Sequence, residues 1–173
     1  MANMFPTMVS DPGDRNRRFT GTVGETWPRT LRLGYYLCLI AAVLMLVIGF
    51  LSLANGVPER LPDAWMIEGA DAELVDRFVF NLRIFAWGNI IFAIALTSAA
   101  AYFRKGSKTA RRWAGVCIGA TIFLNLAGFF VGVAGWASFV VVILLVFALF
   151  FMFRPDANAF VDEKSGDPWR GVE

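Results

Sequence analysis

Residues 113–133 read WAGVCIGATIFLNLAGFFVGV, a stretch of 21 residues without a charged side chain. A helix rises about 1.5 Å per residue, so this stretch can cross a hydrocarbon core about 30 Å thick. Small and polar residues recur along it at spacings of three and four, namely Ala114, Cys117, Thr121, Asn125, Gly128 and Gly132. Membrane helices associate through small residues, which let backbones approach closely, and through polar side chains. The pattern therefore predicts a membrane helix at the centre of a bundle.

Three further apolar stretches cover about residues 33–54, 82–103 and 136–153. The chain has 173 residues, of which 57% are hydrophobic and 17% charged, whereas soluble domains carry about 25% charged residues. We therefore predict an all-α integral membrane protein, with a four-transmembrane-helix bundle over residues 31–154. The last stretch is apolar on all sides, so we expect it to face lipid or another protein.

The polar segments predict the orientation of the bundle. Residues 1–30 form a polar, basic N-terminal tail, and the connection at 104–112 holds five Lys or Arg. The loop at 55–80 holds six acidic and two basic residues. By the positive-inside rule, both termini then lie in the cytoplasm and the acidic loop lies outside. Residues 155–173 are expected to be a polar C-terminal tail, because Pro155 stops the fourth helix.

Two of these segments allow a second interpretation. The N-terminal tail could be an electrostatic anchor to anionic headgroups, although its few arginines favour a plain tail. The acidic loop could bind a divalent cation, but it lacks the alternating order of a calcium-binding loop. A solvated outer face is the preferred interpretation.

Asn89 and Asn125 are the deepest strongly polar residues of the predicted spans. Each lies seven or eight residues from the outer end of its span, which places both roughly 10–12 Å below the outer surface. We expect a hydrogen bond between them, worth about 0.6–2 kcal/mol. They could instead bind a solute, a quinone headgroup or an ion. Arg83 is expected at the outer margin of the membrane, and the GxxxG motif of Gly115 and Gly119 indicates helix packing within this chain or with another.

Several kinds of chemistry are not supported by the composition. The chain has no histidine, which excludes His-ligated haem, His-containing metal sites and Ser-His or Cys-His pairs. Cys38 and Cys117 lie in apolar stretches without CxxC spacing and are read as buried hydrophobic residues. No span has an Asp, Glu or Lys in its middle. We therefore expect no enzyme, cofactor or metal, and the net charge of +2 is too small to suggest a nucleic-acid partner.

The layout of the chain resembles that of small, functionally uncharacterised four-span membrane proteins of actinobacteria. The resemblance covers roughly residues 27–160 and is carried by WPRTLRL before the first span, FRKGSKTARRW between the second and third, and FRPDANAF after the fourth. One group of such proteins consists of accessory subunits of the cytochrome bc–cytochrome oxidase supercomplex. The resemblance implies a subunit without cofactors that packs against larger partners in the plasma membrane.

Three functional hypotheses follow. The leading one is a non-catalytic accessory or assembly subunit of a larger membrane complex, with a respiratory complex as the first candidate, that contacts lipids and protein partners. The second is a small oligomeric transporter or channel with a path lined by Asn89, Thr121, Asn125 and Arg83. The third is an envelope-biogenesis partner that uses the loop at 55–80 as its contact surface.

Overall fold

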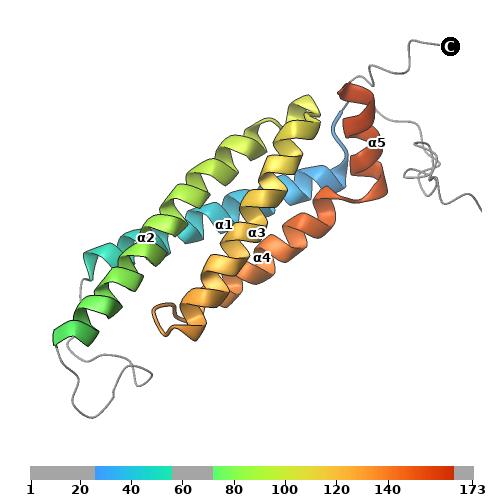
Figure 1. Ribbon diagram of the computed structural model, residues 1–173. Coiled ribbons are helices and arrows are strands. Elements are labelled where there is room, and N and C mark those ends of the chain that lie inside the picture. Colours follow the sequence, from blue (N-terminus) through green and yellow to red (C-terminus); the bar gives the residue numbers. More distant parts are fainter. Residues whose placement is uncertain (1–25, 56–71, 166–173) are drawn as a thin grey trace, which may run out of the picture.

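The computed structural model describes residues 26–55 and 72–165, and this part of the chain is entirely helical apart from short connections. Its elements are α1 (Arg29–Ala54), α2 (Ala72–Ala101), the short 3-10 helix η3 (Phe103–Lys105), α3 (Lys108–Phe130), α4 (Ala137–Met152) and α5 (Pro155–Lys164) (Figure 1). The all-α prediction is therefore confirmed. Most of the predicted N-terminal tail, most of the acidic loop and the end of the C-terminal tail lie outside the described residues.

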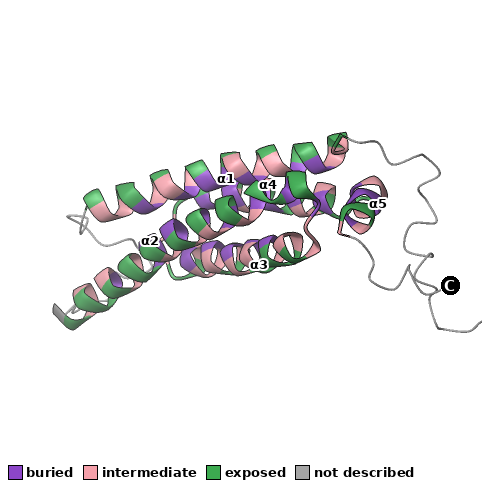
Figure 2. Ribbon diagram, turned by 90° about the horizontal axis from the view of Figure 1, so that it is seen from above, coloured by how far each residue is buried: buried purple, intermediate pink, exposed green. Residues whose placement is uncertain are grey.

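The four long helices form a ring around a shared core. α1 packs on α2 and α4, and α3 packs on the same two helices from the other side (Figure 1). The buried residues lie along the facing sides of the helices (Figure 2). The prediction that residues 113–133 form the centre of the bundle is wrong, because α3 is one of four walls and the centre is filled by side chains from all of them.

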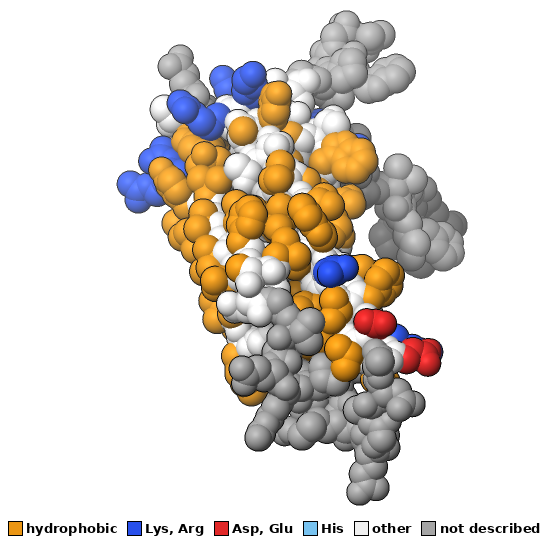
Figure 3. All heavy atoms as spheres, turned by 90° about the vertical axis from the view of Figure 1, so that its left-hand side faces the viewer, with side chains coloured by type: hydrophobic (Ala, Val, Ile, Leu, Met, Phe, Trp, Pro, Cys, Tyr) orange, Lys and Arg blue, Asp and Glu red, His pale blue; other side chains and the backbone are white. Residues whose placement is uncertain are grey.

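The helices have the length and composition of membrane spans. α1, α2 together with η3, and α3 each contain an apolar window long enough to cross a bilayer. α4 is shorter, and it meets this criterion only together with α5, from which it is bent by 62°. A broad hydrophobic band separates a cluster of Lys and Arg at one end of the molecule from acidic side chains toward the other (Figure 3). Three to four spans are therefore compatible with a multi-pass membrane protein.

Glycine residues set the distances between the helices. A Cβ atom at Gly34 of α1 would lie 3.3 Å from the carbonyl oxygen of Ala148 in α4. One at Gly49 would lie 2.9 Å from the carbonyl oxygen of Ala86 in α2. The backbone of α1 is thus in close contact with both neighbours, an arrangement that only small residues permit.

The ends of α3 are fixed by local hydrogen bonds. Ser107 precedes the helix, and its hydroxyl accepts a hydrogen bond from the Ala110 amide at 3.3 Å. At the other end Gly132 has a φ of 78°, and the amide of Val133 donates to the Gly128 carbonyl at 2.9 Å. This is a Schellman ending, which favours glycine at the left-handed position. The prediction that Gly132 belongs to the helix-packing stripe is therefore wrong, because it terminates α3 instead.

The C-terminal segment differs from the predicted polar tail. Pro155 does end α4, but it also occupies the first turn of α5, where its fixed φ and missing amide hydrogen favour a helix start. Ala157, Phe160 and Val161 of α5 are buried against the bundle. Residues 155–164 are therefore a packed helix that lies across one end of the four-helix ring (Figure 1).

Candidate functional site

Two polar clusters lie in the described part of the chain, and the first is the asparagine pair in the core. The Nδ2 of Asn125 donates to Oδ1 of Asn89 at 3.1 Å and to the Thr121 carbonyl at 3.0 Å. The Nδ2 of Asn89 in turn donates to the Phe85 carbonyl at 2.9 Å. Asn89 is 0% and Asn125 1% exposed. The pair thus links α2 to α3, and each amide also donates a hydrogen bond to a backbone carbonyl of its own helix.

Close packing surrounds the asparagine pair. A Cβ at Gly88 would come within 2.6 Å of the Leu124 side chain, and one at Gly128 within 2.6 Å of the Phe85 ring. The glycines on either side of the pair therefore let α2 and α3 approach until the two amides meet. Amide side chains do not ionise near neutral pH, so the arrangement is suited to holding helices together rather than to acid–base chemistry.

Three oxygen or nitrogen atoms keep unused bonding capacity inside the described structure. Oδ1 of Asn125, Oγ of Ser138 and Nε of Arg111 are buried and have no hydrogen-bond partner there. Asn125 and Ser138 belong to the core, whereas Arg111 belongs to the second cluster. Both polar atoms of the Asn89 side chain have a partner, because its oxygen accepts from Asn125 and its nitrogen donates to the backbone.

The remaining predicted site residues do not join the asparagine pair. Thr121 is buried, and its hydroxyl donates to the Cys117 carbonyl one turn earlier at 2.8 Å. Gly119 faces outward, because a Cβ there would have no heavy atom within 4 Å, and a Cβ at Gly115 would meet only the Phe153 ring at 3.8 Å. Arg83 is exposed on α2. The GxxxG motif is therefore open at Gly119 on the outer face of α3, whereas Gly115 lies beside the Phe153 ring.

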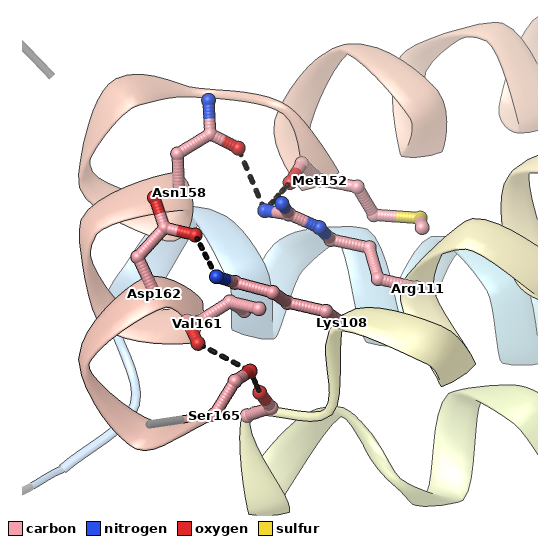
Figure 4. A network of polar contacts seen from close by, with 8 residues as sticks. Lys108, Arg111, Met152, Asn158, Val161, Asp162 and Ser165 are labelled. Atoms are coloured by element: carbon pink, nitrogen blue, oxygen red, sulfur yellow. Dashed lines mark hydrogen bonds and ion pairs between the residues drawn. The ribbon is translucent and has the colours of Figure 1, made fainter. Parts of the chain in front are cut away.

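The second cluster fastens α5 to the bundle (Figure 4). Nζ of Lys108 lies 3.1 Å from Oδ1 of Asp162, and Nη1 of Arg111 donates to Oδ1 of Asn158 at 2.6 Å. The same nitrogen of Arg111 lies 3.4 Å from the Met152 carbonyl at the end of α4. The Ser165 hydroxyl donates to the Gly106 carbonyl at 2.7 Å. The start of α3 and the preceding turn thus hold α5 from Asn158 to its C-cap, Ser165.

α5 also contacts the start of α1, and the Arg111 side chain that holds it packs on an aromatic ring. The Thr30 hydroxyl donates to a carboxylate oxygen of Asp156 at 2.6 Å. The Arg111 guanidinium lies 5.1 Å from the centre of the Phe153 ring, within the range of a cation–π interaction. Contacts to three different helices make α5 an integral part of the fold.

Sequence reasoning missed the second cluster, although a signal was present. Ala157, Phe160 and Val161 have the spacing of one apolar helix face. Pro155 at the start, an acid in the first turn and Lys164 in the last turn are helix-boundary signals. These signals were not used, because Pro155 was interpreted only as the end of the fourth helix.

Within residues 26–55 and 72–165, no group of three or more His, Cys, Asp or Glu side chains is arranged to hold a metal ion. Comparisons of the chain with protein-family models, curated proteins and solved structures gave no match.

Proposed function

We propose that this protein is a non-catalytic accessory or assembly subunit of a larger complex in the plasma membrane. It binds a partner through the outer face of α3 and contributes no cofactor of its own. The resemblance described above makes the actinobacterial cytochrome bc–cytochrome oxidase supercomplex the first partner to test.

The observation that carries the proposal is the open position at Gly119 in the GxxxG motif of α3. Gly119 lies between the exposed side chains of Val116 and Phe123, and nothing in the described chain approaches its Cβ position. The other close helix contacts are occupied, since Gly34, Gly49, Gly88 and Gly128 each abut a neighbouring helix or a core side chain. Membrane helices pack on such small-residue surfaces because the backbones can approach closely. A helix of a partner protein fits this surface.

The asparagine pair favours this function over a transporter. A transport path along Asn89 and Asn125 requires both amides to face a water-accessible space. Both are instead buried, and they bond to each other and to the carbonyls of their own helices. They act in this conformation as a link between α2 and α3.

The distribution of charge supports cytoplasmic termini. α5 and the turn before α3 lie at the end that carries Arg104, Lys105, Lys108, Arg111 and Arg112. The start of α2, at the opposite end, carries Glu73, Asp76 and Arg77. The positive-inside rule assigns the basic end to the cytoplasm.

The proposal is tested by a mild-detergent pull-down of the C-terminally tagged full chain, followed by mass spectrometry and a visible absorption spectrum. We expect a stable larger partner to coelute, and haem absorption would identify it as respiratory. Gly119→Leu should remove the partner because it fills the open surface, whereas Ala101→Leu adds similar bulk to an exposed position of α2 and should not. Recovery of the wild-type chain alone, as a homo-oligomer without pigment, would reject the accessory function and support the transporter.

A further inference from the structure

We propose that the elbow between α4 and α5 is a binding site for one anionic phospholipid, with an acyl chain lying along α4 and the headgroup phosphate at Arg154. This inference requires only that the bundle lies in a membrane, and it is independent of the partner proposed above.

The elbow contains an apolar hollow with a cation at one end. Its walls come from Val146, Leu149 and Phe150 of α4 and from Phe153 just after it, and it ends at Arg154 and Pro155, where the chain bends by 62° into α5. Val146 and Phe150 are each at least half exposed, so the hollow opens to the outer surface of the bundle. The lining thus changes from apolar to cationic over about two helical turns. A phospholipid has matching parts in the same sequence, an apolar acyl chain followed by a charged headgroup.

The Arg154 side chain lies over the hollow. Its guanidinium carbon is 5.2 Å from the centre of the Phe150 ring, one turn back toward the apolar part of α4. The residue is exposed, and no carboxylate of the described residues pairs with it. The nearest acid in sequence, Asp156, accepts instead from Thr30 of α1. An uncompensated guanidinium above an apolar hollow is complementary to a phosphate above an acyl chain.

The other basic side chains near the elbow have partners within the described chain. Lys108 pairs with Asp162, and Arg111 donates to Asn158 and the Met152 carbonyl. Arg154 itself is the residue before α5, and its side chain supplies no cap to the amides of the first turn. Of these groups only Arg111, which donates to neutral oxygen atoms, adds positive potential at this end of the bundle, and Arg154 is the exposed cation beside the hollow.

The test is native mass spectrometry of the full-length protein in detergent, titrated with phosphatidylglycerol and with phosphatidylcholine of the same acyl chains. We expect one phosphatidylglycerol to bind in preference to phosphatidylcholine. Arg154→Gln should weaken phosphatidylglycerol binding about fivefold, which is the effect of one basic residue at an anionic surface. Arg154→Lys should keep most of the preference. Val146→Trp should weaken both lipids, since it fills the hollow without changing the charge.

Arg104→Gln is the matched control, because it removes an exposed arginine from η3, at the same basic end but outside the hollow. It should leave the preference for phosphatidylglycerol unchanged. An equal loss in Arg104→Gln, or an unchanged preference in Arg154→Gln, would overturn the proposal in favour of a diffuse surface charge. Circular dichroism checks that each variant keeps its helices. Should Arg154→Gln fail to fold, Val146→Trp still tests the hollow, because its exposed position leaves the core untouched, and unchanged binding of both lipids would overturn the proposal.

Discussion

The contact between α1 and α2 at Gly49 predicts a large effect from a single added methyl group. In Gly49→Ala, the new Cβ would lie 2.7 Å from Cγ1 of Ile90 and 2.9 Å from the carbonyl oxygen of Ala86. The Ile90 side chain can rotate away, but the Ala86 carbonyl belongs to the backbone of α2, so the two helices must separate. Overpacking of this kind costs about 1–3 kcal/mol. Alanine also favours a helix by about 1 kcal/mol over glycine, which offsets part of this cost.

Gly119→Ala separates these two contributions, because it makes the same exchange in a helix where nothing lies within 4 Å of the new Cβ. We expect Gly49→Ala to have a free energy of unfolding about 1–3 kcal/mol lower than that of Gly119→Ala. Reversible unfolding of both variants in mixed micelles, followed by far-UV circular dichroism, measures this difference. Equal stability of the two variants would refute the claim that backbone contact at Gly49 sets the distance between α1 and α2.

Three further predictions concern the core and α5. A double-mutant cycle of Asn89→Leu and Asn125→Leu should give a coupling of about 0.6 kcal/mol and not above about 1.7 kcal/mol, measured by the same unfolding assay; zero coupling would contradict the bond between the two amides. Phe160→Ala should make α5 more susceptible to limited proteolysis, because truncating a buried Phe costs about 3–5 kcal/mol. Asp162→Asn is the control and should change the cleavage rate little, since a part-exposed ion pair contributes about 0.2–1 kcal/mol. Gly106→Ala should also loosen α5, because Gly106 has a φ of 66° and a Cβ there would collide with the Lys164 side chain; a cleavage rate equal to that of the wild type would show that the turn tolerates the change.

The spans could be predicted from the sequence because a membrane helix needs a long uninterrupted apolar stretch. The stretch predicted at 136–153 became α4 (Ala137–Met152), and the stretch at 82–103 became the inner part of α2 (Ala72–Ala101). Which residues of each helix point into the core was harder to derive. In α3 the buried residue between Ala114 and Thr121 is Ile118, whereas Cys117 is only partly buried. Choosing small residues for the inner face therefore misplaced Cys117, in addition to Gly132, which terminates the helix.

A polar contact could be predicted from the sequence only where the depth of two residues within their spans was enough to place them side by side. Asn89 and Asn125 were expected at equal depth on adjacent antiparallel helices, and the structure brings their side chains within hydrogen-bonding distance. The contacts of Arg111 and Lys108 with α5 depend on the 62° bend after α4. No periodicity in the sequence specifies the direction of that bend, so these partners could not be derived.

The ring arrangement has a consequence for the order in which the protein is made. α1 is synthesised first, yet one of its two packing surfaces, around Gly34, is covered only by Ala148 and Met152 of α4. The Thr30 hydroxyl likewise meets its partner Asp156 only when residues beyond α4 have been added. A ribosome must therefore translate more than a hundred further residues before α1 is enclosed. A chain that ends before Ala148 would therefore leave the backbone of α1 uncovered at Gly34.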